Sequence, residues 1–224
     1  MKHILYLFTV LSVFTSCSNS PNNAAKNNVV ENNVAETLQT KPLTLQDFKK
    51  DFTFFNLTKF EMDTFSWETR PKKYKELDSI TFYMIWQDGK RKFELYCHDY
   101  LFSWQERDTN LIEFTILTDN EGGSWCNNIT YFIFNKKGKL VNKFVVCSDC
   151  GDGGQVFYSY GKFINDKKYE MLCVGYEVPL LEEELIEGDS TLYHFIINDI
   201  GKVTKKEVFN KHFTQKDLKY LTKK

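Results

Sequence analysis

The sequence predicts a mainly β domain, an antiparallel meander that closes as a barrel or folds as a sandwich, with a short helix at each end. Two observations support this fold class. Short apolar or alternating segments follow one another along the second half of the chain, separated by Gly, Asn and Asp turn signals. The chain also has only 4 Pro and 11 Gly while 16% of its residues are aromatic, a composition that favours strands and tight turns.

Two capping patterns predict the helices. Thr44 followed by Asp47 is typical of a helix N-terminus and predicts a short helix that ends near Phe52. Leu45 and Phe52 fall on one side of it, so we expect it to pack on the sheet. The pattern recurs at residues 214–217 and predicts a last helix over residues 215–221.

The predicted strands follow in order along the chain. The Asp-Gly turn at residues 88–89 predicts a hairpin between residues 79–86 and 91–97. Residues 129–134 are apolar on both faces and predict a central strand. The three later hairpins would also fit blades of a small propeller, although their spacing is irregular. The remaining predicted strands are residues 111–117, 140–147, 155–164, 169–176, 191–197 and 202–209.

The N-terminus has the pattern of an export signal. A short basic segment is followed by eleven apolar or small residues, 4–14, which as a helix would rise about 16 Å and so fall short of a bilayer core of about 30 Å. Two small residues and Cys17 come next. This arrangement is typical of a secretory signal peptide.

These residues resemble the precursors of bacterial lipoproteins, although Phe14 stands where that family usually has Leu. The resemblance implies cleavage before Cys17 and acylation of Cys17 with diacylglycerol and a further acyl chain such as palmitate. Ser18 and the lack of a following acidic cluster imply the periplasmic side of a Gram-negative outer membrane. The alternative is a secreted protein that is cleaved nearby and carries no lipid.

The domain organisation follows from this resemblance and from composition. Residues 1–16 are predicted to be a signal peptide, and residues 17–42 a lipidated cysteine with an Asn-rich flexible tether. Residues 43–224 are predicted to form a single β-rich domain.

An oxidising periplasm predicts disulfides among the other cysteines, but five cysteines leave the pairing open. The candidates are Cys97, Cys126, Cys147, Cys150 and Cys173. The spacing of Cys147 and Cys150 also occurs in redox and zinc sites. A Gly-rich segment in place of a helix follows this pair, and the histidines are scattered, so structural disulfides are favoured.

Two loops contain the candidate site residues. Asp149 and Asp152 lie among small residues in segment 148–155, and a similar segment contains Asp119, Glu121 and Trp125. If both lie at one end of the sheet, they would form a polar mouth for calcium or another ligand, with Trp125 as a stacking surface. The alternative is a pair of plain turns. The acidic residues between positions 182 and 189 are interpreted as a solvated connector.

The function class follows from charge and from motifs. A net charge of −1 argues against a nucleic-acid partner. No catalytic or cofactor motif is recognisable, so we expect a binding or accessory module of the cell envelope. It would be held to the membrane by its lipid and would recognise a protein, a glycan or a small ligand. The alternatives are a periplasmic inhibitor or immunity protein, and an enzyme with an unrecognised carboxylate site.

Overall fold

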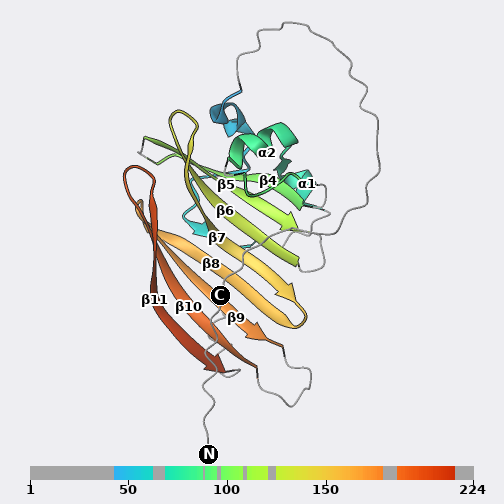
Figure 1. Ribbon diagram of the computed structural model, residues 1–224, viewed down its shortest axis with the longest axis vertical. Helices are drawn as coiled ribbons and strands as arrows, with labels where there is room; N and C mark the ends of the chain where they lie inside the picture. The colour runs from blue at the N-terminus through green and yellow to red at the C-terminus, as the bar shows by residue number, and fades with distance from the viewer. Residues whose placement is uncertain are drawn as a thin grey trace, which may run out of the picture. The chain divides into compact units, whose positions relative to one another are not determined.

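The computed structural model describes residues 43–62, 69–87, 89–94, 97–107, 110–120, 125–178 and 186–214 (Figure 1). Residues 42–224 form one compact unit of the chain. The predicted signal peptide, Cys17, the tether and the predicted last helix lie outside the described residues. Within the described part, no helix is long and apolar enough to span a bilayer.

One eleven-stranded sheet forms the framework, and most of it is an antiparallel meander in which β4 to β11 pair in sequence order. Three short strands are added to it: β1 pairs with β4 in parallel, β3 pairs with β4, and β2 pairs with β8. The mainly β, antiparallel prediction is therefore confirmed. Among the described residues no pairing joins β11 to β1, so the sheet stays open. The strands are β1 Phe54–Phe55, β2 Lys59–Phe60, β3 Lys75–Glu76, β4 Cys97–Gln105, β5 Leu111–Asn120, β6 Trp125–Asn135, β7 Leu140–Asp152, β8 Gln155–Asn165, β9 Lys168–Glu177, β10 Glu187–Ile197 and β11 Val203–Thr214.

The helical elements are short and precede the meander. They are the 3-10 helix η1 Leu45–Asp51 and the α-helices α1 Arg70–Lys73 and α2 Ser79–Ile85. At the start of η1, Asp47 Oδ2 accepts hydrogen bonds from the backbone N–H and the hydroxyl of Thr44, at 2.6 and 2.8 Å. The predicted capping pattern is therefore present, and Leu45 and Phe52 are buried as expected.

Asparagine and glycine form the turns of the meander. The side-chain oxygens of Asn135, Asn165 and Asn198 each accept a hydrogen bond from the backbone N–H two residues later, at 2.9, 3.0 and 3.2 Å. Gly153 and Gly154 both have positive φ, which a two-residue hairpin of this kind requires. The turns predicted at the three asparagines are confirmed.

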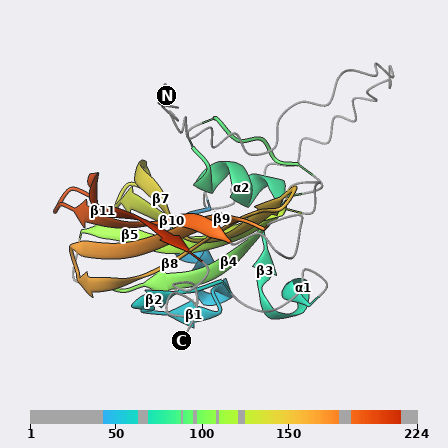
Figure 2. The same cartoon turned by 90° about the horizontal axis from the view of Figure 1, so that it is seen from below.

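Two hydrophobic clusters lie on opposite faces of the central strands. On β6, Tyr131 and Ile133 belong to one cluster, whereas Phe132 and Phe134 belong to the other, as the alternation of a strand requires. All four are fully buried, which confirms that this strand is central. In Figure 2, α2 lies on one side of the sheet, while β1, β2, β3 and α1 lie on the other.

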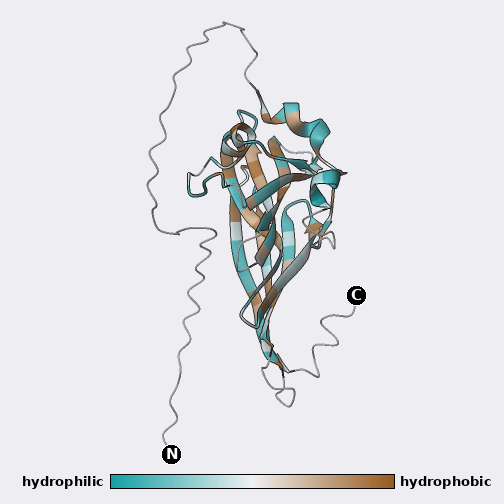
Figure 3. Cartoon of the chain, turned by 90° about the vertical axis from the view of Figure 1, so that its right-hand side faces the viewer, coloured by the Kyte–Doolittle hydropathy of each residue, from teal (hydrophilic) through white to brown (hydrophobic). Residues whose placement is uncertain are grey.

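The sheet folds over on itself, so that strands distant in its order share one core. The rings of Phe144 on β7 and Phe195 on β10 stack with centroids 4.8 Å apart, although a flat sheet would separate these strands by about 14 Å. The single sheet is therefore strongly curved between β7 and β10. Both clusters are built from residues between Leu45 and Phe213, so this unit carries its own core. Hydrophobic and hydrophilic segments alternate along its strands (Figure 3).

The predicted hairpin over residues 79–97 is wrong, because its first arm is helix α2. The Asp78 carboxylate caps this helix by accepting a hydrogen bond from the backbone N–H of Thr81 at 2.7 Å. Phe82 and Ile85, three residues apart, are buried on one face, while Tyr83 is 55% exposed. Burial of a helical face thus outweighed the strand preference of these aromatic and β-branched residues.

The second arm of that hairpin is also wrong. The described residues 89–94 contain no strand, and Cys97 opens β4, which pairs with β5 instead. Sequence reasoning did not identify β4, although four of the five residues 100–104 are aromatic or aliphatic. Segment 148–155, interpreted as a loop, is mostly strand: β7 continues to Asp152, and only Gly153 and Gly154 form the turn.

Candidate functional site

The structure brings two of the predicted carboxylates to the same end of the sheet. Asp119 on β5 lies opposite His98, and Asp149 on β7 lies opposite Asn127. Arg70 of α1 reaches this end, and its Nη1 lies 2.6 Å from Asp119 Oδ2, with both side chains at most 5% exposed. Burial raises the pKa of Asp149, and the charge of Arg70 lowers it in part.

The other predicted members of this polar mouth are placed differently. Trp125 on β6 pairs with Gly151 on β7, so the described residues that flank the two segments lie at the same end of the sheet. Asp152 is exposed and stands three residues beyond Asp149, so the two side chains point to opposite faces of β7. Glu121 lies outside the described residues.

The calcium site remains a prediction. Asp119 is already neutralised by Arg70, a cation that competes with a metal ion for the same oxygen. Within the described ranges, no three or more His, Cys, Asp or Glu side chains are grouped so that they could hold a metal ion. The buried Arg70–Asp119 pair therefore serves to fasten α1 to the sheet edge.

The structure selects one disulfide from the open set. Cys126 on β6 and Cys150 on β7 are directly opposite in register and are bonded. Cys97 and Cys147 are buried thiols, and Cys173 is a half-buried one. Cys150 is thus bonded to a cysteine on the neighbouring strand, and no disulfide joins it to Cys147.

The acidic stretch is divided by the structure. Residues 182–184 lie outside the described part of the chain. Glu187 and Asp189 lie on β10, where their carboxylates approach the ring nitrogens of His212 on β11 at 3.7 and 3.3 Å. All three side chains are exposed, so these contacts contribute little to stability.

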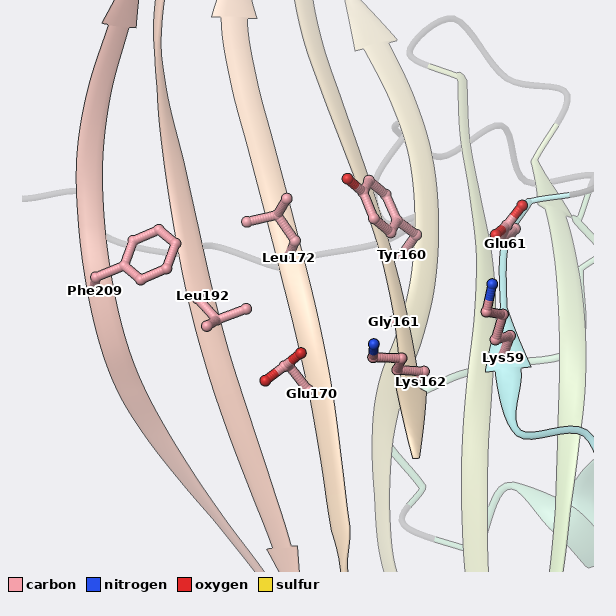
Figure 4. A pocket seen from close by; sticks show the side chains of 9 residues that line it. All are labelled: Lys59, Glu61, Tyr160, Gly161, Lys162, Glu170, Leu172, Leu192 and Phe209. Carbon is pink, nitrogen blue, oxygen red and sulfur yellow. The ribbon is translucent and has the colours of Figure 1, made fainter. Parts of the chain in front are cut away.

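A groove that sequence reasoning missed crosses four strands of the meander and β2 (Figure 4). Its volume of about 330 Å³ falls within the size range of small-molecule sites. Side chains from β2, β8, β9, β10 and β11 line it. They form two parallel rows of different chemistry, which the strand register defines.

The first row is apolar. Tyr160, Leu172, Leu192 and Phe209 are directly opposite one another on β8 to β11. Directly opposite residues share a face of the sheet, so the row is continuous. Figure 4 shows these side chains side by side across the strands. The row remains open to solvent, and Phe209 at its end is 44% exposed.

The second row is charged and lies beside the first. It begins with Lys59 on β2 opposite Lys162 on β8, and continues to Glu170 and His194. His194 Nε2 lies 3.1 Å from Glu170 Oε2. Among the residues that the structure describes, neither lysine ammonium takes part in an ion pair. Like charges directly opposite each other in a sheet are unfavourable unless an anion compensates them.

The groove depends on a change of partner by β8. The pairing of β8 with β7 ends at Ser159, and β2 takes over at Gly161 and Lys162. A Cβ atom at Gly161 would lie only 2.3 Å from the carbonyl oxygen of Glu170 and 2.6 Å from the hydroxyl of Tyr169. Only glycine therefore allows Tyr169 to approach β8 so closely.

The signal for the groove was present but incomplete in the sequence. Tyr160 and Lys162, and Leu172 and Glu170, place an apolar and a charged residue on the same face of neighbouring predicted strands. That mixture is unusual for a core face and indicates a face that solvent can reach. Lys59 carried no signal, because β2 has two residues and is defined only by its tertiary pairing.

Comparisons with models of protein families, with curated proteins and with solved structures each gave no match for this chain. The function is therefore argued from the groove and from the N-terminal sequence alone.

Proposed function

We propose that this chain is an exported lipoprotein, anchored through Cys17 on the periplasmic side of an outer membrane, whose β domain binds a small ligand in the groove on β8 to β11. One observation carries the binding role: four apolar side chains form a continuous row that solvent can reach, beside a row of charges. Such a surface costs solubility and is retained where a ligand covers it.

The domain supports this role in two further ways. Its core is complete without the groove residues, because Leu172, Leu192 and Phe209 belong to neither hydrophobic cluster. A binding surface that does not support the core is free to vary with its ligand. The N-terminal sequence supports the location, since a lipid at Cys17 would hold the domain at a membrane surface.

The binding role is tested with a neutral apolar dye on residues 42–224. We expect N-phenylnaphthylamine fluorescence to rise on binding to the wild type. Leu172→Asp places a charge in the row and should weaken dye binding by tenfold or more. Phe209→Asp, on the edge strand, provides a second variant that perturbs the fold less. Ile200→Asp is the matched control, because Ile200 is 62% exposed in a turn outside the groove. Equal dye binding by the wild type and the three variants would show that the groove is not the binding site.

The anchor is tested separately in a Gram-negative host that expresses the full chain. We expect radiolabelled palmitate to be incorporated into the wild type and to be absent from Cys17→Ser, which should leave the membrane fraction. Cys97→Ser is the matched control and should keep its label. Palmitate on Cys17→Ser, or its absence from the wild type, would contradict the lipoprotein assignment.

A further inference from the structure

We propose that the groove ligand is a single-chain amphiphile with an anionic head group, an inference that rests on the proposed binding role and names its ligand class. The chain would lie along Tyr160, Leu172, Leu192 and Phe209. The head group would be held by the ammonium groups of Lys59 and Lys162. Three features of the groove lead to this class.

The first feature is the shape of the apolar row. It runs across the strands from β8 to β11, a distance of about 14 Å for three strand spacings. Glu170 and Lys162 lie beside the row on one side (Figure 4), and on the other side Tyr158 stacks on Tyr160 with ring centroids 6.3 Å apart. An apolar strip of this length fits an extended hydrocarbon chain.

The second feature is the position of the positive charge. Lys59 and Lys162 are directly opposite in register at the β2 end of the groove, where Glu61 also lines it. Figure 4 shows the Lys162 ammonium extended toward Glu170 and the Lys59 ammonium on the side of Glu61. Two opposed ammonium groups repel each other, and an anion between them would turn that repulsion into two charge-assisted hydrogen bonds. The two lysines are therefore the part of the groove that is electrostatically complementary to a carboxylate or phosphate head.

The third feature is the charge distribution over the rest of the groove. Glu170 is engaged by His194 at 3.1 Å, farther along the charged row. The Phe209 end of the apolar row lies at the sheet edge and is open to solvent. Both lysines, together with Glu61, thus lie at the β2 end of the groove, and Phe209 lies at its open end. This asymmetry sets the direction of the bound amphiphile.

The test compares head groups on one constant chain, by calorimetric titration of residues 42–224 below the micelle concentration. We expect dodecyl phosphate to bind at least tenfold more tightly than dodecyl maltoside, and dodecyltrimethylammonium to bind most weakly. Affinity for dodecyl phosphate should fall as salt is raised. Inorganic phosphate alone should not bind measurably, because it lacks the chain.

The lysines are tested with a double variant and a matched double control. Lys59→Gln with Lys162→Gln removes both charges and keeps part of each aliphatic stem. It should weaken dodecyl phosphate binding by tenfold or more, while the affinity for dodecyl maltoside changes by less than about twofold. Lys136→Gln with Lys137→Gln removes two exposed lysines from a distant turn and should change neither affinity.

The outcomes separate this inference from the proposed function. Equal binding of the three amphiphiles, or unchanged dodecyl phosphate affinity in the lysine variant, would overturn the anionic head group and leave the binding role intact. If inorganic phosphate binds as tightly as dodecyl phosphate, the hydrocarbon chain contributes nothing, and the inference that the ligand is an amphiphile is wrong. If no amphiphile binds and the apolar dye also fails, the groove itself is not a binding site.

Discussion

Cys173 shows how burial controls the chemistry of a single residue. Its thiol lies on β9 beside the larger hydrophobic cluster. Burial raises the pKa of this thiol from its ordinary value of 9.0 to about 11, and the nearby charge of Lys205 lowers it only in part. Since only the thiolate is nucleophilic, Cys173 should be an unreactive cysteine near neutral pH.

We predict that iodoacetamide modifies Cys173 about 100-fold more slowly in the folded domain than in urea at pH 8, because a pKa two units higher leaves about 100-fold less thiolate. Peptide mass spectrometry separates this site from Cys97 and Cys147. The raised pKa contributes stability that is complete below pH 9 and is lost as pH rises toward 11. Cys173→Ser should flatten that alkaline decline. Equal labelling rates in both states would contradict the assignment.

The helix α2 is the element on which local and tertiary preferences differ. Its N-cap Asp78 accepts hydrogen bonds from the backbone, chiefly that of Thr81, and these bonds lower the pKa of the carboxyl. Phe82, Ile85 and Trp86 then cover one face of the central strands. The cap decides where the helix begins, and the sheet surface stabilises it.

We predict that Asp78→Ala lowers the free energy of unfolding by about 1 kcal/mol at pH 7. A lowered pKa means that the contribution of Asp78 is present above pH 3.8 and is lost as pH falls through the pKa of the folded state. Urea titrations at pH 7 and pH 3 measure the difference. Asp78→Asn keeps the capping oxygen and should retain most of the stability without its pH dependence. An alanine variant as stable as the wild type would indicate that the cap is unimportant.

The Cys126–Cys150 disulfide is a second constraint at the level of elements, because it ties β6 to β7 at the end of the sheet where Asp119 and Asp149 lie. We predict that Cys126→Ala with Cys150→Ala costs about 3.5 kcal/mol, given a loop closed over a sequence separation of 24. Urea unfolding with and without reductant measures it. Cys97→Ala keeps the disulfide and is the control, so reductant should shift its midpoint as much as that of the wild type. A midpoint that reductant does not change in the wild type would argue that the bond is absent.

At the scale of the whole molecule, the folded-over sheet makes its two halves depend on each other. The larger cluster joins Tyr131 on β6 and Phe144 on β7 to Tyr169 on β9 and Phe195 on β10. Neither half of the meander would bury these rings alone. The edge strand β11, in contrast, is largely exposed and carries Lys205, Lys206 and Lys211, which disfavour pairing with another sheet edge.

We predict a single cooperative unfolding transition for residues 42–224. Trp86 and Trp104, two of the four tryptophans of the chain, lie in the smaller cluster and contribute to the tryptophan fluorescence, whereas far-ultraviolet circular dichroism reports on the whole sheet. The two urea curves should coincide. Phe144→Ala, in the larger cluster, should shift both curves equally by about 3 kcal/mol or more. Separate midpoints, or a shift in one curve only, would show that the halves fold independently.

What the sequence determined by itself is local. The turns at Asn135, Asn165 and Asn198 and the central position of residues 129–134 were predictable, because a turn depends on adjacent residues and a strand buried on both faces is apolar throughout. The capping pattern at Thr44 was predictable for the same reason. The residues of α2 have strand-forming side chains, and they form a helix only because packing on the sheet surface stabilises its buried face.

Only the tertiary structure decided the groove and the surroundings of the predicted carboxylates. Arg70 lies far from Asp119 in sequence and gave no local signal, yet it supplies the charge that neutralises this carboxylate. Lys59 meets Lys162 only because β8 exchanges β7 for β2. Register across several strands assembles both groups, and register depends on the packing of the whole core, so residue types along the chain do not reveal it.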